Sequence, residues 1–451
     1  MLISKDRGFY RELFKLSLPI ALSSLVTFSI SLSNNMMIAR LGNEASSAVY
    51  LSNQIAFLLT MLVAGIEGAV LVSASHSIGA GENENARKIA SVGLISAFAV
   101  ASFFFVFSSF TPRFSLSLLT NNKTLIEGGR DFLIPLGISF LFFAPSQAMA
   151  AALRTVKKPK IAFFAALSAL AVNVSLNFVL IFGKFGIKAL GIRGAGISTL
   201  AARIVEFFIL FIYTFFIDRE LNIRLSSLFK IGKDSFKRFF KTGTPLILTQ
   251  LVWSINIFFA SALMGRNESF VVAGLSAAIA LYNLSYVVTN GMSGALGIIV
   301  GRTVGSGEPK ALERLLSSRR KNIELIFAFL GILTAVFIQI LKAPFISFWG
   351  VKDEALFFAR GFINVLSVMV IGTAYQSASL NGFIKSIGDV FFVLKTESFF
   401  VFCVIIPASL LAANLGASPF LVFAILKCDQ ILKCPVAFFK LKKLSLGKYK
   451  K

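Results

Sequence analysis

The sequence predicts an all-α polytopic membrane protein with twelve transmembrane helices, arranged as two six-helix lobes. Its 451 residues are 56% hydrophobic and only 15% charged, whereas a soluble globular domain is typically about 25% charged. Long apolar runs alternate with short breaks that contain charged residues, Gly or Pro, and the second half of the chain repeats the first. These three observations exclude a soluble domain and indicate a transmembrane bundle built by duplication.

The apolar runs are long enough to cross a hydrocarbon core about 30 Å thick at about 1.5 Å per helical residue. Twelve spans are predicted: 14–39, 49–76, 89–111, 132–153, 161–182, 196–217, 243–265, 271–301, 323–347, 361–383, 391–413 and 418–439. The charged start leads directly into a first run that is too long for the apolar region of a cleavable signal peptide. We therefore expect the first span to remain in the protein.

The net charge of +24 fits membrane topology better than nucleic-acid binding, because Lys and Arg lie in short loops and not on one amphipathic face. With both termini inside, the inner segments hold most of the 45 Lys and Arg residues, as the positive-inside rule expects. We expect a multi-pass, monomeric protein of the inner (plasma) membrane with cytoplasmic termini. Its partners would be the lipid bilayer and a small organic substrate, and not nucleic acid.

A basic segment, 218–242, separates an N-terminal lobe, 1–217, from a C-terminal lobe, 243–451. A shift of 226 residues aligns the lobes, and several matches fall on residues whose backbone geometry is restricted: Pro19 with Pro245, Gly65 with Gly291, Gly68 with Gly294 and Gly81 with Gly307. Because each lobe has an even number of spans, both copies enter the membrane in the same direction. We expect the lobes to be related by an axis along the membrane normal, with a cavity between them, as in transporters.

The first span has polar side chains on one helix face: Ser24, Thr27, Ser31 and Asn34 are spaced by three or four residues. A polar stripe in a membrane helix seldom faces lipid. It either lines a water-filled cavity or lets a neighbouring helix pack closely, since small polar residues are common at such contacts.

Five stretches carry a family resemblance: NNMMIARLG, SIGAGENENAR with its counterpart TVGSGEPKALER, LRTVKKPK, NVSLNFVLIFG and GIRGAGISTLAARIVE. Together with the spans and the duplication, they resemble the multidrug and toxic compound extrusion (MATE) family over essentially the whole chain. This family belongs to the multidrug/oligosaccharidyl-lipid/polysaccharide exporter superfamily. The resemblance implies two six-helix lobes, alternating access, and export of organic, often cationic, compounds against proton or sodium entry.

The acids that the resemblance implies are replaced. Asn34 and Asn177 stand where family members commonly have Asp, and Asn177 follows Asn173 by four residues. In the branch that couples through the C-terminal lobe, the acidic positions hold Trp253 and approximately Ala374. An amide does not titrate, so Asn34 and Asn177 cannot carry protons, although their oxygens could help to coordinate sodium. The three asparagines either form a neutral hydrogen-bonding floor to a cavity or pack the lobe.

Carboxylates inside other spans are further candidates. Glu67 lies within the second span, where an acid is costly unless it is paired, protonated or hydrated; it is either a coupling group or a hydrogen-bonded structural residue. Glu206 follows Arg203 by three residues, which favours an internal ion pair. Asp429 precedes Lys433 by four residues in the last span, where structural pairing is expected for the same reason.

Aromatic and proline residues complete the candidate set. Trp253 and Asn256 lie on one stripe of the seventh span, and Tyr282 and Tyr286 on one stripe of the eighth, where aromatic faces could receive flat organic cations. Pro19 removes a backbone hydrogen bond early in the first span and is a candidate hinge.

The chain is not expected to be an enzyme, because its single histidine, His76, and its three cysteines form no catalytic or metal-binding pattern. It lacks the G-x-x-x-x-G-K-[ST] motif of ATP-driven pumps, so we expect a secondary transporter without cofactors. It would export organic, cationic or amphiphilic compounds by antiport with sodium or protons. The alternatives are a lipid-intermediate flippase of the same superfamily and a non-transporting member that has lost the coupling acids.

Overall fold

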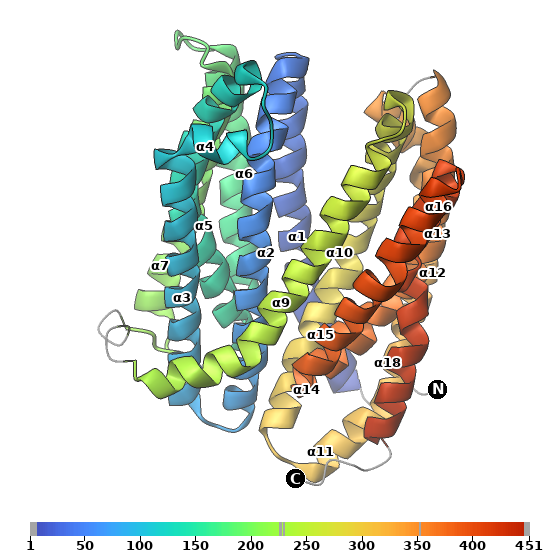
Figure 1. Cartoon of the computed structure of the whole chain (residues 1–451). Helices are drawn as coiled ribbons and strands as arrows, with labels where there is room; N and C mark the ends of the chain where they lie inside the picture. Colours follow the sequence, from blue (N-terminus) through green and yellow to red (C-terminus); the bar gives the residue numbers. More distant parts are fainter. Residues whose placement is uncertain (1–6, 225–227, 229–230, 351–352, 446–451) are drawn as a thin grey trace. The chain divides into compact units, whose positions relative to one another are not determined.

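The computed structural model describes residues 7–224, 228, 231–350 and 353–445, and within these ranges all regular secondary structure is helical (Figure 1). The first half contains α1 (Arg7–Ala39), α2 (Asn43–Gly79), α3 (Asn83–Phe105), η2 (Val106–Phe110), α4 (Pro112–Ser117), α5 (Lys123–Thr155), α6 (Pro159–Phe182), α7 (Gly191–Ile212) and η3 (Tyr213–Ile217), where η denotes a short π-helical segment.

The second half contains α9 (Lys233–Met264), α10 (Ser269–Gly305), α11 (Pro309–Arg314), η4 (Leu315–Arg319), α12 (Arg320–Trp349), α13 (Asp353–Gln376), η5 (Ser377–Ile384), α14 (Lys385–Ile387), α15 (Val390–Phe399), η6 (Phe400–Ile405), α16 (Ile406–Asn414), α17 (Pro419–Lys427) and α18 (Asp429–Ser445). The π-helical segments continue the helices on either side of them, so η5 joins α13 to α14 and η6 joins α15 to α16.

Eleven helical stretches in the described part of the chain are long and apolar enough to cross a membrane, and they correspond to the first eleven predicted spans. The twelfth predicted span, 418–439, forms α17 and α18, which are separated at Cys428. The amide of Cys428 bonds to the carbonyl of Ile425, three residues back, which tightens the last turn of α17. A count of twelve continuous helices is therefore not confirmed.

The inter-lobe loop is shorter than the predicted 218–242, because α9 begins at Lys233. Helix geometry does not end where the hydrocarbon ends, and lysine and arginine are good helix formers in water. The charged turns before the apolar run therefore continue the same helix, as they also do in α1, which begins at Arg7.

The internal repeat appears in the backbone. Gly81 and Gly307, which the shift of 226 residues aligns, both have positive φ, at 78° and 65°. The residues that follow them, Glu82 and Glu308, stand at the N-cap positions of α3 and α11. Because L-residues with side chains rarely adopt this left-handed conformation, each glycine permits the sharp turn between two helices. The matched sequences thus fold into matched turns.

The helices form two compact units. The N-terminal unit comprises residues 22–247, and the C-terminal unit comprises residues 1–21 and 248–451. Each boundary falls two residues after one of the matched prolines, Pro19 in α1 and Pro245 in α9, so both helices contribute to both units. A proline removes one helical hydrogen bond and weakens the helix at that point, which is where a long helix bends most readily.

Within each unit, the fourth long helix is central. In the N-terminal unit α5 packs against α2, α3 and α7, and in the C-terminal unit α13 packs against α10, α12 and α18. The contact between α13 and α18 is a backbone contact: a methyl group added at Gly372 would collide with the carbonyl oxygen of Gln430. Only glycine allows the two helices to approach this closely.

Gly372→Ala should therefore destabilise the protein by roughly 1 to 3 kcal/mol, because the added methyl group forces α13 and α18 apart. Gly294→Ala in α10 is the matched control, since its methyl group would meet its nearest neighbour, in Ile20, at an ordinary 3.6 Å. The measurement is the melting temperature of the purified protein in detergent. Equal melting temperatures for the two variants would contradict the backbone contact.

Candidate functional site

The N-terminal unit contains a cluster of amide side chains that links three helices. Asn177 of α6 donates one hydrogen bond to Oδ1 of Asn34, in α1, and another to Oδ1 of Asn173 at 3.1 Å. Asn34 in turn lies 3.4 Å from the hydroxyl of Thr199 in α7. Asn173 and Asn177 are fully buried, and Asn34 is half-buried. The structure thus brings together the three asparagines that the sequence singles out and adds Thr199 to them.

Two polar atoms of this cluster have no hydrogen-bond partner within the described part of the protein: Nδ2 of Asn173 and Oδ1 of Asn177. A buried donor and a buried acceptor without partners cost free energy, and sites that bind ligands or ordered water commonly contain such atoms. None of the four side chains in the cluster carries a charge. The cluster can donate and accept hydrogen bonds, but it cannot exchange a proton near neutral pH.

The other polar side chains of α1 are satisfied within the helix. Thr27 donates to the carbonyl of Ser23 at 3.0 Å, and Ser31 lies 3.5 Å from the carbonyl of Thr27. Both side chains are exposed on the surface of the N-terminal unit. Because their hydroxyl protons bond to the preceding turn, these residues present mainly hydroxyl oxygens outward.

The acid Glu67 in α2 is paired. Its carboxylate lies 3.6 Å from a guanidinium nitrogen of Arg154, at the end of α5, and both side chains are about one-fifth exposed. Glu206 is also paired, as expected: it lies 2.6 Å from Arg203, and Gln147 of α5 donates to its second oxygen at 3.3 Å. Both acids therefore join α5 to another helix of the N-terminal unit, and a coupling role for Glu67 stays a prediction.

Lys158, between α5 and α6, holds the segment that follows η3. Its ammonium group lies 2.7 Å from Asp218 and 3.0 Å from Glu220. Partial burial opposes the charged form, but these two carboxylates outweigh that effect and raise the pKa of Lys158 above its ordinary value. The ion pairs are therefore fully present at neutral pH and are lost only as the pH rises above about 10.4.

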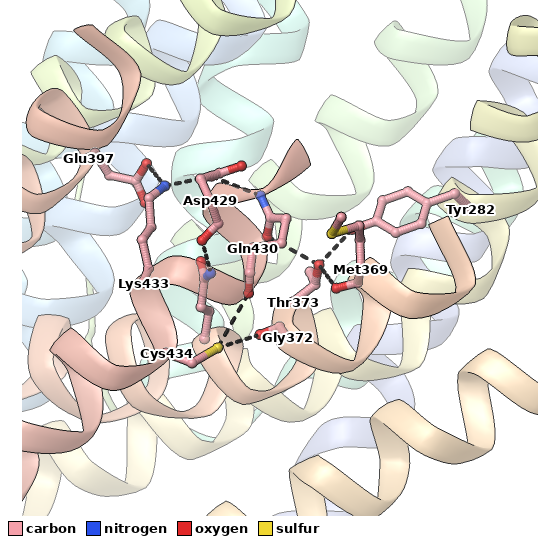
Figure 2. Close-up of polar contacts among 10 residues, drawn as sticks. Tyr282, Met369, Gly372, Thr373, Glu397, Asp429, Gln430, Lys433 and Cys434 are labelled. Carbon is pink, nitrogen blue, oxygen red and sulfur yellow. Dashed lines mark hydrogen bonds and ion pairs between the residues drawn. The ribbon is translucent and has the colours of Figure 1, made fainter. Parts of the chain in front are cut away.

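Hydrogen bonds hold the two tyrosine candidates of the C-terminal unit in place. The rings of Tyr282 and Tyr286 in α10 are parallel, with centroids 6.1 Å apart. Their hydroxyls bond to Thr373 at 3.0 Å and to Ser377 at 2.9 Å (Figure 2 shows Tyr282 and Thr373). Both tyrosines are half-buried.

The candidates of α9 differ in their exposure. Trp253 is 41% exposed, whereas Asn256, one turn later, is buried, and its Oδ1 has no partner among the described residues. Trp253 stands where the resemblance implies a coupling acid. The indole of Trp253 can stack on a ligand but cannot titrate.

Sequence reasoning missed one member of a buried charged cluster. Lys433 of α18 lies 2.7 Å from Asp429, as its spacing predicts, and also 2.6 Å from Glu397 of α15 (Figure 2). The side chains of Lys433 and Asp429 are 2% and 3% exposed. A signal for Glu397 was present, because it is an acid inside the predicted span 391–413. Its partner is 36 residues away, however, and helical spacing cannot reveal a partner on another helix.

Asn177→Asp should lower the stability of the N-terminal unit by about 3 kcal/mol or more. The new carboxylate would replace a donor that serves two carbonyl oxygens, so an uncompensated buried charge would face two acceptors. Asn122→Asp is the matched control, because Asn122 is an exposed N-cap at which aspartate serves equally well. Thermal melting in detergent at neutral pH measures both variants, and an unchanged melting temperature for Asn177→Asp would rule out the buried amide cluster.

The chain matches the MatE family model over residues 19–179 and 245–411, one stretch in each half. It is 22% identical over 382 residues to a "Probable multidrug resistance protein NorM" of Thermotoga maritima, covering 84% of this chain and 80% of the relative. A protein of the same description from Brucella suis is 26% identical over 323 residues, covering 69% of this chain and 67% of the relative.

Solved structures of similar fold are membrane transporters. The chain resembles a MOP superfamily transporter from Pyrococcus furiosus with a TM-score of 0.84 and 18% identity, over 98% of this chain and 96% of that one. A mutant of the Vibrio cholerae MATE transporter VcmN gives a TM-score of 0.82 and 17% identity, over 98% of each chain. At such identities the likeness shows the fold.

Proposed function

Because the chain belongs to the MatE family of membrane transporters, we propose that it exports organic cations or amphiphiles by ion-coupled antiport with alternating access. It is a multi-pass membrane transporter and not an enzyme. The proposal takes a proton or sodium as the coupling ion, needs no cofactor, and places the protein in the plasma membrane with both termini in the cytoplasm.

The amide cluster of the N-terminal unit is the observation that supports this proposal most directly. Two of its members, Asn34 and Asn177, occupy positions at which the MATE resemblance implies acids, and it offers one unpaired donor and one unpaired acceptor in a buried setting. A neutral cluster of this kind can hydrogen-bond the polar groups of an organic compound. It cannot titrate, so the N-terminal unit would recognise substrate and leave proton coupling to another part of the protein.

The parallel rings of Tyr282 and Tyr286 support a cationic substrate. A cation over an aromatic face is attracted by the ring quadrupole, by about 0.5 kcal/mol at exposed sites to about 2 kcal/mol when it is desolvated. Hydrogen bonds to Thr373 and Ser377 fix both rings, so little conformational entropy would be lost when a flat cation binds.

The two prolines support alternating access. Pro19 and Pro245 each lie two residues before the point at which their helix passes from one compact unit to the other. In this proposal the bends in α1 and α9 near these prolines accompany the switch between the two access states, with Pro19 as the hinge of α1.

The test uses purified protein in proteoliposomes loaded with ethidium, a flat organic cation. Imposing a proton or sodium gradient should drive ethidium uphill, because the antiported ion supplies the energy. Protein-free liposomes are the control for leakage. Absence of ethidium movement under both gradients, with a folded protein and a known exporter active in parallel, would contradict the proposal.

Tyr286→Ala should raise the KM for ethidium roughly two- to thirtyfold, the range expected for losing one cation–π contact. Tyr286→Phe is the matched variant: it keeps the ring, loses only the hydroxyl bonded to Ser377, and should stay close to the native KM. Initial transport rates over a range of ethidium concentrations give both values. If alanine and phenylalanine have the same effect, the ring does not contact the cation.

A further inference from the structure

The function proposed above assigns no role to the charged cluster of Glu397, Asp429 and Lys433. One ammonium group lies within 2.7 Å of two carboxylates, and two of the three side chains are almost completely buried (Figure 2). Burying charges this deeply costs several kcal/mol per ion. The ion pair of Lys433 with Glu397 would by itself join α15 to α18, without the second buried carboxylate. The second carboxylate therefore calls for an explanation beyond packing.

We propose that this cluster binds the coupling proton of the transporter on Asp429 and releases it when an organic cation binds at the tyrosine pair. The inference rests on the proposed antiport function and deepens it by assigning the coupling ion and its site. It concerns the C-terminal unit only.

Three interruptions of regular α-helical geometry lie next to the charged cluster. Glu397 lies in the last turn of α15, just before η6, and Asp429 begins α18 directly after the break at Cys428. Gln376 ends α13 just before η5 and donates to the backbone carbonyl of Asp429 at 2.8 Å. π-helical segments are often found at functional sites, and interrupted membrane helices mark ion sites in transporters. Three helices of the unit lose their regular geometry next to the same three charges.

Asp429 has an oxygen available for a proton. Its Oδ2 accepts hydrogen bonds from Lys433 and Gln430, whereas its buried Oδ1 has no hydrogen-bond partner within the described part of the protein. A proton on Oδ1 would leave the existing bonds to Oδ2 in place. Sodium fits less well, because it needs several oxygen ligands and the ammonium group of Lys433 already lies between the two carboxylates.

Several other titratable groups, on α18 and on neighbouring helices, also lie close to Asp429. Lys427, at the end of α17, is close enough for its charge to act on Asp429, and so are Tyr282, Cys428 and Cys434. With both lysines charged and both acids ionised, the charges sum to zero. Binding one proton changes the sum to +1. Counted together with Lys427, the cluster is thus neutral when empty and positive when protonated.

A chain of hydrogen bonds joins this cluster to the proposed substrate position. Gln430 donates to Asp429 at 3.1 Å and lies 3.1 Å from the hydroxyl of Thr373, which is 3.0 Å from the hydroxyl of Tyr282. A positive cluster at one end of this chain disfavours an organic cation at the other, and a neutral cluster permits it. Proton and cation would therefore bind in alternation, which is the order that antiport requires.

The N-terminal unit has a side chain of different charge at the position that is equivalent to Asp429. The shift of 226 residues that aligns the two halves places Arg203 on Asp429 and Gln147 on Thr373. In the N-terminal unit the cationic side chain Arg203 is paired with Glu206, to which Gln147 also donates. The two copies therefore carry opposite charge at this position, and the acid stands in the C-terminal copy.

Infrared difference spectroscopy of the purified protein tests the site without any substrate. Acidifying the native protein should produce the carbonyl stretch of a protonated carboxyl group in a water-poor environment. Asp429→Asn should weaken this band, to which other buried acids such as Glu206 also contribute. Asp389→Asn is the matched control: it removes another acid paired with a lysine in the same unit and keeps a good N-cap for α15, so the band should keep its native strength. An unchanged band in Asp429→Asn would overturn the proposal.

Transport assays of variants distinguish a failure of this inference from a failure of the proposed antiport function. Asp429→Asn and Glu397→Gln should each reduce proton-driven ethidium accumulation by about tenfold or more, whereas Asp389→Asn, which lies outside the cluster, should keep native accumulation. Each of the two cluster variants leaves Lys433 one carboxylate, and native-like melting confirms folding. Full proton-driven accumulation in both cluster variants would overturn the inference and leave the antiport proposal standing. If the native protein moves no ethidium, the antiport proposal fails, and the infrared band still decides whether Asp429 binds a proton.

Discussion

Hydrocarbon offers no hydrogen-bond partner to a buried charge, so a charged side chain inside a membrane protein must be paired by another part of the same protein. In both units of this transporter, that requirement determines which helices are joined. Glu67 pairs with Arg154 to join α2 to α5, and Lys433 pairs with Glu397 to join α18 to α15. Each of these pairs thus holds two helices of one unit together.

The duplicated halves have kept one framework and diverged in chemistry. The matched turns at Gly81 and Gly307 and the central positions of α5 and α13 show the common framework. The polar clusters differ. The asparagine cluster of the N-terminal unit is uncharged and suited to hydrogen bonding, whereas the charged cluster of the C-terminal unit contains two carboxylates. Such a difference would allow one copy to recognise substrate and the other to respond to protons.

Much of the fold could be predicted from the sequence, because bilayer thickness sets the length of an apolar span and apolar composition is visible residue by residue. The twelfth span shows the limit. Its composition is apolar on both sides of Cys428, so hydropathy continues through a point at which the helix is interrupted. In the same way, Lys233 begins a helix before the apolar run, since helical geometry and hydrophobicity are separate properties.

The sequence by itself determined the membrane architecture, the duplication, the family resemblance and the grouping of Asn173 with Asn177, because each depends on composition or on short, regular spacing. Only the tertiary structure decided which distant residues meet. It placed Asn34 against Asn177 across 143 positions, paired Glu67 with Arg154, and brought Glu397 to Lys433. The physical reason is that helix packing, and not sequence spacing, determines which helix faces touch. The close backbone contact of Gly372 in α13 with Gln430 in α18, for example, determines which side chains of these two helices lie in one site.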